Sequence, residues 1–136
     1  MSDEMVVRIS GLRIDVADSG ADIVDEVNLA LRPGEVLGLV GESGSGKTTV
    51  GLAVLGHARR GVRLAGGRIT VDGMEVLDLD ARQLRSLRGQ LVTYVPQDPG
   101  TALNPALRIR TQLMEVLEQH DFGGSPAARE ARLQEV

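Results

Sequence analysis

Apolar and polar residues alternate along residues 6–16 and, less regularly, along residues 23–31. This period of two predicts two strands, each with one buried face. Turn-forming residues fill positions 18–22, so the two strands are expected to form a hairpin. Residues 36–40 are apolar on both faces, which predicts a strand in the middle of a parallel sheet. Residues 90–95 predict a second buried strand.

A second hairpin is predicted around Asp72 and Gly73, because this dipeptide favours a tight turn between strands. The flanking strands are expected at residues 68–71 and 74–76. Asp80 is a candidate N-cap for a short helix. A proline-containing loop is expected at residues 96–105. Helices are predicted over residues 47–55, 80–87, 107–119 and 126–136.

Composition narrows the class of protein. The chain has 136 residues, of which 42% are hydrophobic and 25% charged, as in an ordinary globular domain. The absence of cysteine excludes disulfides and thiolate metal sites. A net charge of -4 and only two aromatic residues, Tyr94 and Phe122, argue against nucleic-acid binding. The N-terminus does not read as a signal peptide and no apolar run is long enough to span a membrane, so we expect a cytoplasmic protein.

Residues 41–48 carry the strongest chemical signal. They read Gly-Glu-Ser-Gly-Ser-Gly-Lys-Thr, which fits the phosphate-binding loop pattern G-x-x-x-x-G-K-[ST] without a mismatch. Glycines let backbone amides approach phosphate oxygens, and the following helix presents its N-terminus to the same anion. Lys47, the sole lysine of the chain, would reach the β- and γ-phosphates. The Thr48 hydroxyl would bind the Mg²⁺ that bridges them.

A phosphate-binding loop alone does not distinguish ATPases, GTPases and kinases, although no Asn-Lys-x-Asp guanine motif is present. Two longer segments do distinguish them. Residues 31–40 read Leu-Arg-Pro-Gly-Glu-Val-Leu-Gly-Leu-Val, and residues 94–105 read Tyr-Val-Pro-Gln-Asp-Pro-Gly-Thr-Ala-Leu-Asn-Pro. Through these segments nearly the whole chain resembles the ATP-binding subunits of ABC transporters, and among them those of the oligopeptide, dipeptide and nickel importers.

This resemblance implies an α/β fold of the P-loop NTPase type, the ABC-type nucleotide-binding domain. Residues 1–96 would form its antiparallel β subdomain and phosphate-binding core. Residues 97–136 would form the Q-loop and the start of the helical subdomain, truncated before the signature motif. The implied cofactors are ATP and Mg²⁺. The implied nucleotide contacts in the loop are Gly41, Glu42, Ser43, Gly44, Ser45, Gly46, Lys47, Thr48 and Thr49.

The resemblance also assigns roles to two residues outside the loop. Gln97 corresponds to the Q-loop glutamine, whose amide oxygen can approach Mg²⁺ and the attacking water while the loop couples to the membrane subunit. The implied catalytic residues are thus Lys47 and Gln97, and the implied metal contacts are Thr48 and Gln97. Family members stack an aromatic residue on adenine near the end of the first strand. The closest position here is Val16, which offers apolar contact without an aromatic face.

The implied partners are transmembrane permease subunits and a second ATP-binding subunit, either identical or homologous. Membrane contact would be indirect, at the cytoplasmic face. The Leu-Ser-Gly-Gly-Gln signature, the catalytic glutamate and the switch histidine of the family do not occur in these 136 residues. We therefore expect this chain alone to bind ATP without efficient hydrolysis. Two alternatives stay open: a nucleotide-binding remnant that serves as an interaction module, and a soluble ABC-type ATPase acting outside transport.

Two groups of arginines fall outside these motifs. Three arginines lie in residues 59–63, a predicted basic loop to which the sequence assigns no role. Arg82, Arg85 and Arg88 recur at three-residue spacing, so we expect them to form one solvated face of a helix.

Overall fold

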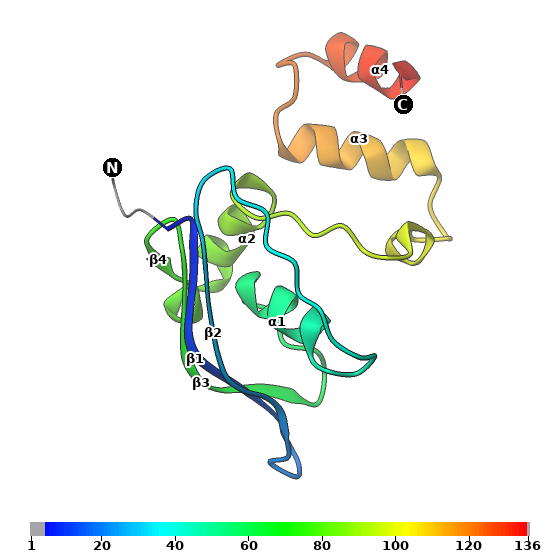
Figure 1. The fold of residues 1–136 in the computed structure, drawn as a ribbon. Helices are drawn as coiled ribbons and strands as arrows, with labels where there is room; N and C mark the ends of the chain where they lie inside the picture. The colour runs from blue at the N-terminus through cyan, green and yellow to red at the C-terminus, as the bar shows by residue number, and fades with distance from the viewer. Residues whose placement is uncertain (1–4, 136) are drawn as a thin grey trace. The chain divides into compact units, whose positions relative to one another are not determined.

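A four-stranded antiparallel sheet in the order β2-β1-β3-β4 is the frame of the first part of the chain (Figure 1). The computed structural model describes residues 5–135, apart from the side chains of Pro99 and Thr101. Both predicted hairpins are confirmed, and Asp72 and Gly73 adopt the positive φ angles (48° and 75°) of the predicted turn. The strands are β1 (Val7–Val16), β2 (Asp22–Leu31), β3 (Val62–Val71) and β4 (Met74–Glu75).

β1 is a central strand, paired with β2 on one side and β3 on the other. Ile9, Leu12 and Ile14 are all buried, although Ile9 and Leu12 are separated by an odd number of positions. Between them β1 advances by three residues while β2 advances by two, which is the signature of a β-bulge. The bulge reverses the alternation of side chains, so the three residues share the core with Ile69 and Val71 of β3.

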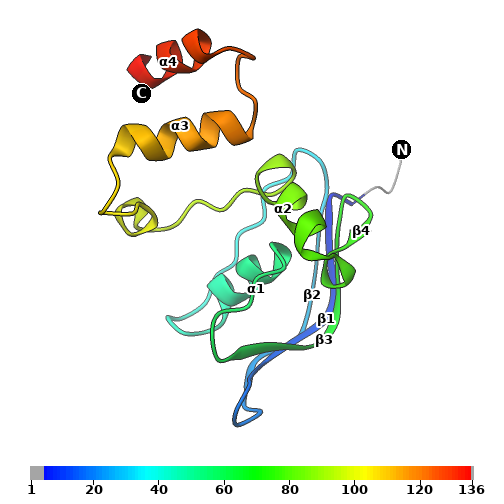
Figure 2. The ribbon, with the colours of Figure 1, turned by 180° about the vertical axis from the view of Figure 1, so that it is seen from behind.

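Two helices pack against this core. Val50 and Ala53 of the first helix and Leu87 of the second belong to the same buried cluster as the β1 residues, and both helices lie on one side of the sheet (Figure 2). Asp80 is the N-cap of the second helix, as predicted. It forms a capping box: its carboxylate accepts from the backbone amide of Gln83 (2.8 Å), and the Gln83 side chain accepts from the backbone amide of Asp80 (2.9 Å). The elements are α1 (Lys47–Val54), the short η1 (Val76–Asp78) and α2 (Ala81–Gln90).

Arg88 has a second role besides the predicted exposure at the end of α2. The backbone leaves the helical conformation at this residue (ψ 121°). Its Nε donates to the Leu55 carbonyl (2.8 Å) and its Nη2 to the Gly56 carbonyl (3.0 Å), both at the C-terminal end of α1. Arg82 and Arg85 are exposed as expected. Arg88 is exposed too, as predicted, but it also binds the end of α1, because the last carbonyls of a helix lack intrahelical donors and attract a cation.

The strands predicted at residues 36–40 and 90–95 are not formed among the described residues. Val36 and Val40 are 95% and 98% exposed, the opposite of the burial that their apolar character predicted. A strand inside a parallel sheet needs hydrogen-bonded neighbours on both sides. Within residues 5–135 no strand pairs with either segment. Both predictions are therefore wrong, because the neighbouring strands that they require are not formed.

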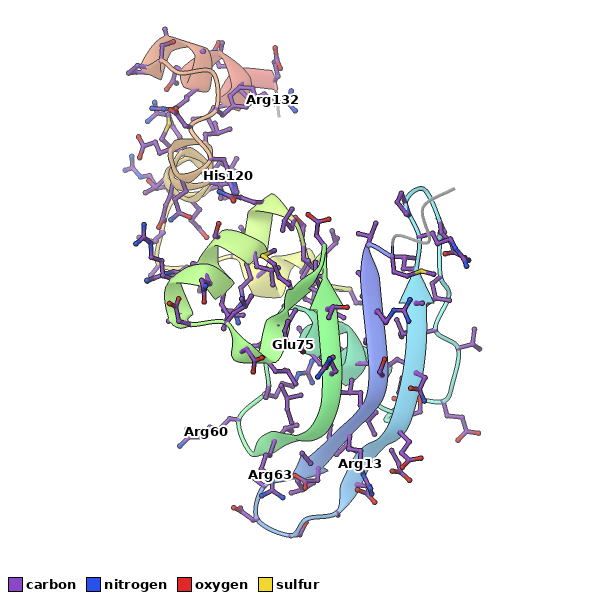
Figure 3. All side chains as sticks on the ribbon, turned by 90° about the vertical axis from the view of Figure 1, so that its left-hand side faces the viewer. Arg13, Arg60, Arg63, Glu75, His120 and Arg132 are labelled. Carbon is purple, nitrogen blue, oxygen red and sulfur yellow. The ribbon has the colours of Figure 1, made fainter. Side chains whose placement is uncertain are left out.

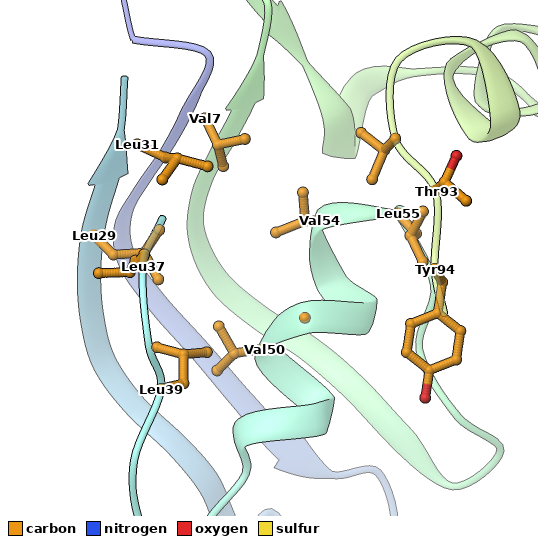
Figure 4. A pocket seen from close by; sticks show the side chains of 12 residues that line it. Val7, Leu29, Leu31, Leu37, Leu39, Val50, Val54, Leu55, Thr93 and Tyr94 are labelled. Carbon is orange, nitrogen blue, oxygen red and sulfur yellow. The ribbon is translucent and has the colours of Figure 1, made fainter. Parts of the chain in front are cut away.

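An apolar hollow of about 470 Å³ lies between these two segments (Figure 4). Leu37 and Leu39 line it from one segment, and Val92 and Tyr94 line it from the other. Residues of β1, β2 and α1 complete the lining, among them Val50. The apolar side chains of the first segment therefore border open space instead of a neighbouring strand.

The second unit of the structure begins at Val95, directly after the first unit ends at Tyr94. The helices predicted over residues 107–119 and 126–136 are confirmed, the first starting two residues later than expected; Val136 lies outside the described residues. An ion pair between Arg110 and Glu130 joins them. The elements of this unit are η2 (Pro99–Ala102), α3 (Ile109–Gln119) and α4 (Pro126–Glu135).

The architecture agrees with the α/β fold that the resemblance implied, with the antiparallel sheet, the loop entering α1 and further helices following in order. The functional subdivision into residues 1–96 and 97–136 stays a prediction. No helix within residues 5–135 is both long enough and apolar enough to cross a lipid bilayer.

Candidate phosphate-binding site

The loop of residues 41–46 enters α1 through a glycine in a left-handed conformation. Gly46 has φ 84°, and no side chain caps the helix at this position. A Cβ here would lie 2.9 Å from Val24 Cγ2 and 3.0 Å from the Ile23 carbonyl oxygen of β2. Both the backbone conformation and the close approach of β2 therefore require glycine.

The backbone amides of residues 46–49 are available to a ligand. Among the described residues they have no hydrogen-bond acceptor, and the next amide, that of Val50, donates to the Gly46 carbonyl (2.9 Å). The first turn of α1 contains no acidic residue. Free amides and the positive end of the helix dipole together favour an anion at this point.

Lys47 folds back from the first position of α1 into the preceding loop. Its Nζ donates to the Gly41 carbonyl (2.7 Å), to the Glu42 carbonyl (2.6 Å) and to Ser45 Oγ (3.1 Å). These contacts hold the ammonium against the backbone of the loop at residues 41–45. A fixed positive charge thus lies next to the free amides.

A hollow of about 180 Å³ opens at the loop, lined by residues 44–49 and by Arg59. Its lining fits a polyphosphate, because it combines the first amides of α1 with the cationic residues Lys47 and Arg59, and no Asp or Glu of the described residues lines it. The exposed Thr48 hydroxyl is an oxygen ligand of the kind that Mg²⁺ combines with substrate phosphates. Residues 5–135 contain no group of three His, Cys, Asp or Glu side chains suited to a metal. A cation at Thr48 would therefore share its ligands with a bound phosphate.

The two predicted site residues outside the loop lie in different units. Val16 is the last residue of β1, half-buried, and pairs with Val62 of β3. Gln97 is exposed, in the bend that precedes η2 in the second unit. The structure gathers residues 41–49 into one loop and helix start, and the roles of Val16 and Gln97 stay predictions.

Arg59 is the lining residue that the sequence did not single out. The predicted basic loop of residues 59–63 is shorter than expected, because Val62 and Arg63 already belong to β3. Arg59 lines the hollow at residues 44–49, Arg60 extends away from the ribbon, and Arg63 contacts Asp15 (Figure 3). The three residues are all arginines within five positions, so the sequence alone could not predict which of them lines the hollow.

Comparisons with known proteins extend to most of the chain. A family model described as ABC transporter matches residues 24–136. The chain is 42% identical over 118 residues to the oligopeptide transport ATP-binding protein OppD of Salmonella typhimurium, and 40% identical over 119 residues to that of Escherichia coli. It is 39% identical over 113 residues to the dipeptide transport ATP-binding protein DppD of Haemophilus influenzae. These alignments cover 85%, 86% and 83% of this chain but 35%, 35% and 34% of the relatives. The chain therefore spans about a third of the length of these curated relatives.

Proposed function

This chain belongs to the ABC transporter family, as its two motif segments predicted, and from that premise we propose that it binds ATP through residues 41–49. The free amides of residues 46–49 would bind phosphate oxygens, with the Lys47 ammonium beside them. The Thr48 hydroxyl would contribute to the binding of Mg²⁺, which neutralises charge on the β- and γ-phosphates. The observation that carries this proposal is the uncapped start of α1, which has free amide donors and a fixed ammonium at the same loop.

Titration of the 136-residue chain with a fluorescent ATP analogue in the presence of Mg²⁺ tests this site. Lys47→Ala is expected to weaken binding by about tenfold or more, since hydrogen bonds to charged groups contribute about 1.5–3 kcal/mol. Arg85→Ala, at an exposed position on α2, is the matched control and should bind like the wild type. Circular dichroism verifies that each variant is folded. Equal affinity of the wild type and Lys47→Ala would overturn the proposal.

We propose further roles for residues around the nucleotide. Gln97 orients the attacking water and contributes to the Mg²⁺ site, since an amide oxygen does both without adding charge. Lys47 stabilises charge that develops on the transferred phosphoryl group. Thr49 adds its backbone amide to the phosphate contacts, and Val16 offers an apolar surface to adenine. The free Thr49 amide and the half-buried Val16 side chain support the last two assignments.

For the whole protein we propose a role as the ATP-binding subunit of an importer of peptides or similar small solutes. The relatives are named as oligopeptide and dipeptide transport ATP-binding proteins, which supports this substrate class. The partners would be transmembrane permease subunits and a second ATP-binding subunit, identical or homologous. The protein would sit peripherally at the cytoplasmic face of the membrane. The same names favour transport over a soluble ABC-type ATPase with another role.

For these 136 residues alone we propose ATP binding without efficient hydrolysis. Within residues 5–135, no carboxylate or imidazole that could act as a general base lines the hollow at residues 44–49. Phosphate release from Mg-ATP should therefore equal the buffer blank. Turnover above the blank that Lys47→Ala abolishes would contradict this part of the proposal.

A further inference from the structure

The three arginines that follow α1 have three different environments. Arg63 is paired with Asp15, and Arg60 extends away from the ribbon (Figure 3). Arg59 lines the hollow at the phosphate-binding loop, twelve positions after Lys47 in the chain. Its guanidinium has no hydrogen bond or ion pair within the part of the chain that the structure describes. A free cation therefore borders the same hollow as the free amides of α1.

The path of the backbone explains why Arg59 returns to the loop. The segment after α1 runs back alongside the helix towards its N-terminal end before β3 begins (Figures 1 and 2). A tight turn follows, in which the Val62 amide donates to the Arg59 carbonyl (3.0 Å). The turn is tied to the end of β1, because the Ala17 amide donates to the Gly61 carbonyl (3.0 Å) and Val16 pairs with Val62. The turn that carries Arg59 is thus anchored to β1 and β3.

The chemistry of the hollow indicates what Arg59 meets there. Its other lining residues are 44–49, and the backbone amides of 46–49 have no acceptor in the part of the chain that the structure describes. A guanidinium offers planar paired donors that match phosphate oxygens, and it is always charged. Lys47 has its ammonium bound against the backbone of the loop at residues 41–45, so the two cations occupy different parts of the site.

We propose that Arg59 is a second cationic contact to the phosphates of the bound nucleotide. This inference rests on the proposed ATP binding at residues 41–49 and adds a residue to it. The guanidinium donates to phosphate oxygens, and among the described residues that line the hollow Lys47 is the other one that carries a charge. It increases affinity for any ligand that carries the polyphosphate group, whatever base is attached.

Calorimetric titration with two ligands tests this role: ATP and inorganic tripolyphosphate, each with Mg²⁺. Arg59→Ala is expected to weaken the binding of both ligands by about tenfold, as the loss of a charge-assisted contact implies. Arg60→Ala is the matched control, one position away and directed away from the ribbon, and should stay within about twofold of the wild type. Circular dichroism checks the fold, and Arg59→Gln, which keeps most of the side chain's length, replaces the alanine variant if that one is unfolded.

Three outcomes overturn the assignment. Unchanged affinity of the Arg59 variant for both ligands would show that the guanidinium does not contact the nucleotide. Weaker binding of ATP with unchanged binding of tripolyphosphate would place Arg59 on the base or ribose instead of the phosphates. An equal loss of affinity in Arg60→Ala would show that removing any nearby positive charge weakens binding, without a direct contact from Arg59 to the phosphates. Failure of the ATP site itself is distinguishable, because Lys47→Ala would then bind both ligands like the wild type.

Discussion

Arg63 holds Asp15 in a bidentate ion pair, with Nε 3.0 Å from Oδ1 and Nη2 2.6 Å from Oδ2. The two residues are register partners on β3 and β1, and Asp15 is only 6% exposed. The hydrogen bond from Arg63 lowers the pKa of Asp15 against the opposing effect of burial, and Asp15 raises the pKa of Arg63. The pair thus fastens β1 to β3 beside Val16, where the turn that carries Arg59 is anchored.

Replacing Arg63 should change how stability depends on pH. The pKa of Asp15 in the folded protein lies below the unfolded value of about 3.9, so the stabilisation is complete above about pH 4 and is lost as the pH falls through the folded value. Arg63→Met removes it, which should lower the free energy of unfolding at neutral pH and flatten its fall below about pH 4. Urea unfolding between pH 7 and pH 3 measures both effects. Arg60→Met should keep the wild-type dependence of unfolding free energy on pH. The same dependence in Arg63→Met would disprove the stabilising role of the Arg63–Asp15 ion pair.

Arg88 should contribute more to stability than its neighbours on α2. Its guanidinium donates to the Leu55 and Gly56 carbonyls, which have no donor within α1. Arg88→Ala is expected to lower the free energy of unfolding by about 1.5–3 kcal/mol. Arg85→Ala, at an exposed position, should change it by less than about 0.5 kcal/mol. Chemical denaturation of the two variants measures the difference, and equal values would refute the capping role.

Two adjacent glycines of β3 should respond differently to alanine. Gly67 has φ 92°, and a Cβ there would lie 2.5 Å from the Gly11 carbonyl oxygen and 2.6 Å from Leu12 Cα. These are backbone atoms of the β1 bulge and cannot move aside, so Gly67→Ala should cost more than about 3 kcal/mol or prevent folding. A Cβ at Gly66 meets nothing within 4 Å, and Gly66→Ala should stay within about 1 kcal/mol of the wild type. Thermal melts of the pair test this, and similar melting temperatures would rule out the close approach.

Two apolar residues test the difference between the core and the unpaired segment at residues 36–40. Leu12 is 0% exposed and Val40 is 98% exposed. Leu12→Ala should lower the free energy of unfolding by about 2–5 kcal/mol, because it leaves a cavity. Val40→Ala should lower it by less than about 0.5 kcal/mol, since this side chain buries almost no surface. Urea titration gives both values, and a loss above about 1 kcal/mol for Val40→Ala would mean that this segment is packed in solution.

The features that the sequence predicted correctly depend on residues close together in the chain. The hairpin of β1 and β2 follows from the period of two, and the turn before β4 follows from Asp72 and Gly73. The N-cap of α2 follows from Asp80, whose partner is three positions away. The geometry of residues 41–48, whose phosphate binding stays a prediction, is equally local, because Lys47 contacts residues at most six positions before it. Each of these features depends on one short segment, and a sequence pattern carries information only about residues within such a segment.

Burial and side-chain direction were decided by the tertiary structure. The apolar character of residues 36–40 was read correctly, but burial of Val36 and Val40 requires neighbouring strands that the described residues do not supply. Arg63 and Arg88 find partners 48 and 33 positions away, which no local pattern encodes. The sequence by itself thus determined the family of the chain and predicted the chemistry of its loop. Only the tertiary structure separated Arg59, at the hollow of residues 44–49, from Arg60 and Arg63, because a long side chain is placed by the fold of distant segments around it.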